Sequence, residues 1–202
     1  MTDLQADAEH KAKMQRIKAA RDRMMAEKTE TRGLLVVHTG KGKGKSSAAW
    51  GMVMRCLGHG MRVGIVQFIK GAWSTGEAAF LKRFPDLVTI RTMGEGFTWE
   101  TQDRVRDIAA AECAWAEAQK MLNDREIQLI VLDELNVALR YEYLPVDAVL
   151  AAVAGRPERQ HVVITGRNAP QALIDAADLV TEMTLVKHPF RAGIKAQPGI
   201  EF

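Results

Sequence analysis

The sequence predicts an α/β protein in which helices cover both faces of a mostly parallel sheet of about six strands. Short apolar runs alternate with helical segments along residues 33–202. Runs such as LLVV, VGIVQFI, LIVLD and HVVIT are apolar on both faces, which is typical of central strands covered by helices on either side. A glycine-rich turn also follows the first run and leads into a helix, as expected where a parallel sheet binds a ligand.

The elements follow in order along the chain. Strands are expected at 34–39, 63–69, 88–93, 129–134, 161–165 and 179–186, and helices at 45–58, 76–83, 101–122, 145–154 and 169–176. The longest helical segment, Arg104 to Leu122, carries Ile108, Ala111, Trp115 and Leu122 near one face. We expect that face to pack in the core.

Length and composition limit the possible classes. A chain of 202 residues with 47% apolar and 26% charged residues suggests one globular domain, with room for an added arm. No run approaches the roughly 20 apolar residues of a membrane span, so no membrane partner is expected. Two cysteines without a spacing pattern suggest a reducing cytoplasm. A net charge of +3 is too small to indicate a nucleic-acid partner.

The first 32 residues differ from the rest of the chain. Within residues 10–28, Met14, Ile17, Met24 and Met25 fall near helical spacing and basic residues fill the other faces. This pattern predicts a basic amphipathic helix that cannot form a domain alone. It is either a solvated arm or a lid over a site for an anionic ligand.

The strongest motif is HTGKGKGKSS, which lies between the first strand and the first helix of the domain at residues 38–47. It has the Walker A arrangement, in which glycines turn backbone N–H groups toward phosphates, Lys45 adds charge and Ser46 offers a hydroxyl to Mg²⁺. Thr39 stands where the usual pattern has glycine. We therefore expect a RecA-like P-loop fold that binds a nucleotide triphosphate through Thr39, Gly40, Lys41, Gly42, Lys43, Gly44, Lys45, Ser46 and Ser47.

Two carboxylates complete the predicted site. LIVLDELN ends its apolar run at Asp133 and Glu134, at the strand end where ligands bind in open α/β sheets. Either acid could hold Mg²⁺ together with Ser46, with Glu134 favoured as the direct ligand, or could instead cap the following helix. Weaker candidates for lining the site are Arg55, Gln67, Lys70 and Arg167.

An aromatic segment follows the third strand. In GEGFTWE, two glycines precede Phe97 and Trp99. The two rings could fold back into the core, form an apolar wall for a large flat ligand, or stack on nucleic-acid bases.

Taken together, several motifs resemble those of the ATP:corrinoid adenosyltransferases of the cob(I)yrinic acid a,c-diamide type. They are TGKGKGKSSAAWG, VGIVQFIKG, GEGFTWE, VLDELN, VVITGRN and the tail VKHPFRAGIKAQPGIEF. The resemblance covers residues 33–202, fits the basic arm and accounts for Thr39 in the loop.

The resemblance implies the reaction. A Co(I) corrinoid, either cobalamin or a cobyrinic acid a,c-diamide, attacks the 5′ carbon of ATP and releases triphosphate, in adenosylcobalamin biosynthesis or corrinoid salvage. The cobalt is the nucleophile, so no catalytic serine, cysteine or general base is needed. Lys45 would stabilise the leaving triphosphate, and ATP would lie in the loop with reversed polarity.

The resemblance also implies roles for the remaining parts. Phe97 and Trp99 would displace the lower axial ligand of the corrinoid, which raises the cobalt reduction potential. Flavodoxin or a flavin reductase would then supply the electron, the arm would cover the corrinoid, and the enzyme would be a homodimer.

Two other functions remain open on the residues alone. A RecA-like ATPase acting on nucleic acid would use the basic arm and the aromatic pair, and would show steep salt-dependent binding to single strands. A small-molecule kinase would release ADP rather than triphosphate.

Overall fold

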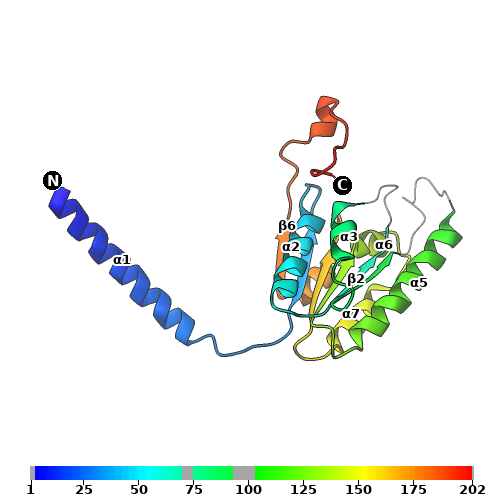
Figure 1. The fold of residues 1–202 in the computed structure, drawn as a ribbon, viewed down its shortest axis with the longest axis horizontal. Coiled ribbons are helices and arrows are strands. Elements are labelled where there is room, and N and C mark those ends of the chain that lie inside the picture. The colour runs from blue at the N-terminus through cyan, green and yellow to red at the C-terminus, as the bar shows by residue number, and fades with distance from the viewer. Residues whose placement is uncertain (1–2, 70–74, 93–102, 202) are drawn as a thin grey trace. The chain divides into compact units, whose positions relative to one another are not determined.

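The computed structural model describes residues 3–69, 75–92 and 103–201 (Figure 1). The chain divides into two compact units, residues 1–32 and residues 33–202.

The larger unit is built on a six-stranded parallel sheet in the order β3-β2-β4-β5-β1-β6. The predicted α/β class is therefore confirmed. The four inner strands are almost wholly buried, as their two-sided apolar sequences require, whereas β6 at one edge is exposed. The strands span Leu35–Thr39 (β1), Val63–Gln67 (β2), Val88–Thr92 (β3), Leu129–Asp133 (β4), His161–Thr165 (β5) and Leu179–Glu182 (β6).

Helices cover both faces of this sheet (Figure 1). One face packs against α2 and α3 through Ala49, Val53 and Leu81, and the other packs against α5 to α8. The helices span Lys45–Gly58 (α2), Gly76–Leu81 (α3), Arg104–Leu122 (α5), Leu135–Arg140 (α6), Val146–Ala154 (α7) and Gln171–Ala176 (α8). In α5, Ala111, Trp115 and Leu122 are buried as expected, whereas Ile108 is only half-buried.

Most elements differ from the expected bounds by a residue or two at one end, and two differences are larger. The last strand was expected to reach residue 186 but ends at Glu182, because its partner β1 ends opposite it at Thr39, where the glycine-rich loop begins. Helix α6 was not expected. Glu134, at a left-handed φ of 60°, turns the chain sharply after β4, and no glycine in the sequence marks this turn.

In the smaller unit, helix α1 spans Asp3–Ala26. Met14, Ile17, Met24 and Met25 are exposed. These residues are too few among alanines and charges to form a continuous apolar stripe, so the faces of the helix differ little in hydropathy. The expectation of an amphipathic helix was therefore too strong, although its helical character is correct.

Across the described ranges, no helix has both the length and the apolar character that crossing a membrane requires.

Candidate active site

The glycine-rich loop connects β1 to α2 and encloses the side chain of Lys45. The ammonium Nζ donates hydrogen bonds to the carbonyl oxygens of Gly40, at 3.0 Å, and Gly42, at 2.6 Å. Removal from water lowers the pKa of Lys45, an effect that Glu134 and Asp133 oppose and that Arg167 and Lys43 reinforce. The loop thus holds a buried cation at the N-terminus of a helix, where backbone N–H groups and the helix dipole also favour an anion.

The glycines of this loop are needed for reasons that the sequence did not reveal. Gly44 has a φ of 106° and directly precedes α2, a conformation that favours glycine. A Cβ on Gly42 would collide with the backbone of Thr184 and lie 2.8 Å from the carbonyl oxygen of Met183. The N–H of Gly42 also donates to that Met183 oxygen at 2.7 Å. The closest approach of the loop is therefore to the chain that follows β6.

Asp133 ends β4 and accepts hydrogen bonds from two hydroxyl groups. Its Oδ1 accepts from Ser46 Oγ at 2.8 Å and from Thr165 Oγ1 at 2.7 Å. The strand order places β5 between β1 and β4, and Thr165 at the end of β5 fills that gap. Gln67 at the end of β2 approaches the other oxygen, with its Nε2 3.5 Å from Oδ2. Asp133 is 6% exposed, and these neighbours hold its carboxylate in place.

Glu134 occupies the position before α6, but its side chain makes no capping hydrogen bond. Its backbone N–H donates to Thr165 Oγ1 at 2.9 Å, which supports the left-handed turn. Burial raises the pKa of Glu134, and Asp133 raises it further, whereas Lys45 and Arg167 lower it. The site therefore presents two adjacent carboxylates, of which Asp133 is the one bonded to Ser46.

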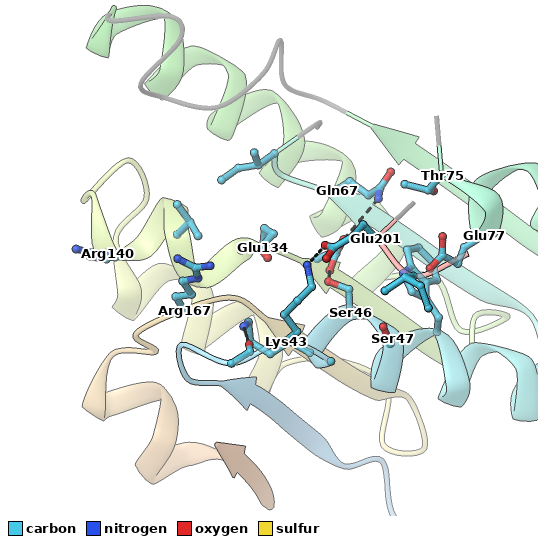
Figure 2. A pocket seen from close by; sticks show the side chains of 18 of the residues that line it. Lys43, Ser46, Ser47, Gln67, Thr75, Glu77, Glu134, Arg140, Arg167 and Glu201 are labelled. Atoms are coloured by element: carbon cyan, nitrogen blue, oxygen red, sulfur yellow. Dashed lines mark hydrogen bonds and ion pairs between the residues drawn. The ribbon is translucent and has the colours of Figure 1, made fainter. Parts of the chain in front are cut away.

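These groups face one cavity of about 500 Å³ at the carboxyl ends of the strands (Figure 2). Positive groups of the loop lie beside the acidic pair, and Arg167 reaches the cavity from the loop after β5. Such a cavity suits an anionic ligand together with a cation. Its lining consists of Gly42, Lys43, Gly44, Lys45, Ser46, Ser47, Trp50, Gln67, Ile69, Thr75, Glu77, Asp133, Glu134, Val137, Arg140, Tyr141, Arg167, Ile200 and Glu201.

Comparison with known proteins decides the family. Residues 31–202 match the family model described as ATP:corrinoid adenosyltransferase BtuR/CobO/CobP. This chain belongs to that family. A corrinoid adenosyltransferase of Pseudomonas aeruginosa is 61% identical over 97% of each chain. The corrinoid adenosyltransferase CobA of Salmonella typhimurium is 44% identical, over 98% of this chain and all of the relative.

The fold is also found outside the family. The flagellar accessory protein FlaH of Methanocaldococcus jannaschii superposes with a TM-score of 0.50 at 13% identity, covering 75% of this chain and 71% of FlaH. At that identity the likeness concerns the fold alone. ATP:corrinoid adenosyltransferases transfer the adenosyl group of ATP to a corrinoid in cobalamin synthesis, so the chain is a transferase that uses these two substrates.

In this adenosyltransferase, most of the predicted loop residues line the cavity, but not all. Gly40 and Lys41 are outside the lining, and Thr39 is buried with its Oγ1 accepting from the N–H of Ala169 at 3.0 Å. Thr39 therefore joins the loop to the segment after β5. Gln67 and Arg167 reach the cavity and Arg55 does not. Lys70, Phe97 and Trp99 lie outside the described residues.

Several cavity residues were missed from the sequence. Trp50 lies on α2, and Arg140 and Tyr141 lie at the end of α6, a helix that was not expected from the sequence. The guanidinium of Arg140 lies 5.4 Å from the ring centre of Tyr141, which stacks on Tyr143. Ile200 and Glu201 come from the distant end of the chain, and the only signal for them was the family-like tail itself.

Proposed function

We propose that this chain performs its family's adenosyl transfer by binding the triphosphate of ATP in the glycine-rich loop. The observation that carries the proposal is the convergence of Lys45, the start of α2 and the Ser46–Asp133 pair on one cavity. A buried cation, a helix N-terminus and acidic oxygens are the groups that a polyphosphate and its cation require. The 5′ carbon of the same ATP would then face the corrinoid.

The chemistry asks for charge stabilisation and positioning rather than proton transfer. The Co(I) corrinoid is the nucleophile, and the bond from the 5′ carbon to the triphosphate oxygen breaks as the cobalt–carbon bond forms. Lys45, Lys43 and Arg167 offset the negative charge that develops on the leaving triphosphate. The reversed orientation of ATP, inferred from the family resemblance, leaves the 5′ carbon accessible.

The acidic pair fits Mg²⁺. Ser46, Asp133 and Glu134 offer hard oxygen ligands at the cavity wall. Among the residues that the structure describes, no three His, Cys, Asp or Glu side chains gather around one point, so part of the shell would come from phosphate oxygens and water. Bound there, Mg²⁺ would neutralise charge on the triphosphate.

Other parts of the proposal rest on the resemblance. Phe97 and Trp99 would contact the lower corrin face and displace the axial ligand, flavodoxin or a flavin reductase would deliver the electron, and the arm of residues 1–32 would cover the corrinoid. The enzyme would act as a homodimer in the cytoplasm.

The decisive experiment is anaerobic incubation of the protein with Mg-ATP and chemically reduced cob(I)alamin. We expect the optical spectrum of a light-sensitive cobalt–carbon product and release of triphosphate. Release of ADP would contradict adenosyl transfer and favour a kinase. Hydrolysis without a cobalt product, stimulated by single-stranded nucleic acid, would favour a RecA-like ATPase.

A further inference from the structure

The segment after β6 returns to the glycine-rich loop at two points. Close to the strand, Met183 and Thr184 pack against Gly40 and Gly42. The segment then passes through an exposed 3-10 helix, Pro189–Ala192, and comes back at Ile200 and Glu201, which line the cavity. This segment carries the family-like tail motif, to which the proposed reaction assigns no role.

Glu201 makes an ion pair with Lys43 of the loop (Figure 2). The side chain of Glu201 is only 16% exposed, whereas that of Lys43 is 48% exposed. A turn positions the carboxylate, because the N–H of Glu201 donates to the Gln197 carbonyl oxygen at 2.9 Å. A carboxylate of the chain itself is thus ion-paired with a lysine that faces the proposed phosphate site.

The second contact point depends largely on this charge pair. Ile200 lines the cavity but leaves 76% of its surface exposed, so apolar burial adds little there. Partly exposed ion pairs contribute little net free energy. A triphosphate carries several charges and can also reach Lys45 and Arg167, so it has the larger electrostatic attraction to the same cavity.

We propose that Glu201 competes with polyphosphate for Lys43 of the glycine-rich loop, and that ATP binding displaces it and releases Ile200 and Glu201 from the cavity. The inference rests on the proposed function, since it takes the loop to be the triphosphate site. It assigns the tail a regulatory role: the charge of Lys43 stays neutralised until a polyphosphate enters, and occupancy of the site changes the position of the tail.

The test measures binding of inorganic tripolyphosphate and pyrophosphate without corrinoid, by titration calorimetry at low salt. We expect Glu201→Gln to tighten both by roughly fivefold, the scale of a partly exposed ion pair. The factor should be the same for both ligands, because Glu201 must leave before either one enters. Glu126→Gln, an exposed carboxylate at the opposite end of β4, removes the same charge and should have no effect. In a Lys43→Met background, Glu201→Gln should add nothing.

A second measurement uses the unmodified protein. Amide hydrogen exchange within residues 185–201 should accelerate when tripolyphosphate binds. Unchanged or weaker binding by Glu201→Gln, or unchanged exchange in this segment, would overturn the inference. If Glu201→Gln weakened the binding of ATP but not of tripolyphosphate, Glu201 would be a ribose ligand. If it weakened binding only in the presence of Mg²⁺, Glu201 would be a metal ligand. Either result would reject competition. Adenosyl transfer by the wild-type protein is scored separately, so its failure does not affect this readout.

Discussion

The hydroxyl of Ser46 donates a hydrogen bond to Oδ1 of Asp133 across 2.8 Å, joining the first turn of α2 to the end of β4. The two residues lie 87 positions apart in the sequence. Strand β1, which leads into the glycine-rich loop, and strand β4, which ends at Asp133, lie on opposite sides of β5. Of the two adjacent carboxylates, Asp133 is therefore the one that is hydrogen-bonded to the hydroxyl of the loop. Sequence reasoning favoured its neighbour Glu134 as the direct metal ligand.

This contact predicts unequal effects for the two carboxylates. Asp133→Asn should weaken Mg²⁺-dependent ATP binding by about tenfold or more, because it removes a charge held against Ser46. Glu134→Gln should have a smaller effect. Binding titrations with and without Mg²⁺ measure both, with the exposed Asp86→Asn as control. A larger loss in Glu134→Gln would restore the original preference.

Lys45→Ala should abolish adenosyl transfer with any corrinoid. Its ammonium is buried in the loop and is the group best placed to stabilise the leaving triphosphate. The anaerobic assay with cob(I)alamin measures the loss, and Lys82→Ala, which changes an exposed lysine after α3, serves as the control. Normal turnover by Lys45→Ala would remove the loop from the mechanism.

Trp99→Ala tests the proposed role of the aromatic segment. Transfer that starts from Co(II) with a flavoprotein donor should fall severely, because displacement of the axial ligand is needed to raise the cobalt potential. Transfer from chemically generated Co(I) should be largely retained. The two assays are run side by side, and equal losses would favour simple corrinoid binding over a role in reduction.

Gly42→Ala tests the packing of the loop on the chain after β6. The added methyl group would collide with the backbone at Met183 and Thr184, so we expect a loss of about 1–3 kcal/mol in unfolding free energy and weaker ATP binding. Gly51→Ala in α2 is a matched control with open space around the new Cβ, and should stabilise by up to about 1 kcal/mol. Denaturant titrations compare the variants. A fully stable Gly42→Ala that binds ATP normally would show that the loop can move away from Met183.

The burial of His38 leads us to expect that the unfolding free energy depends on pH. It is 4% exposed on β1, and neither ring nitrogen has a hydrogen-bond partner within the described part of the chain. Burial lowers its pKa below the ordinary value of 6.5. The unfolded chain therefore binds more protons than the folded chain as the pH falls below that value, and stability decreases toward acid.

His38→Phe should remove this contribution. We expect a flatter dependence of unfolding free energy on pH below 6.5, with stability at neutral pH raised by about 1 kcal/mol because the two unpaired ring nitrogens of His38 are removed. Part of the acid sensitivity should persist, since burial and the charge of Arg156 also lower the pKa of His161. Denaturant titrations between pH 5 and pH 8 follow the effect, and an unchanged slope would contradict it.

Much of the fold could be predicted because its signals are local. The apolar runs correctly predicted the bounds of β5, His161–Thr165. The strand–loop–helix pattern correctly predicted those of α2, Lys45–Gly58. The short α6 was missed because the turn at Glu134 is made by a non-glycine residue supported by Thr165 from another strand. The tail beyond Glu182 was misjudged because a strand ends where its partner ends.

The sequence by itself determined the fold class, the glycine-rich loop between a strand and a helix, the acidic strand end and the family, because each depends on residue types at short spacings. Only the tertiary structure decided which carboxylate meets Ser46, why Gly42 must lack a side chain and that Glu201 reaches Lys43. These contacts join residues on different strands and at distant points of the chain. Their existence depends on strand order and on the path of the chain after β6, which no local pattern records.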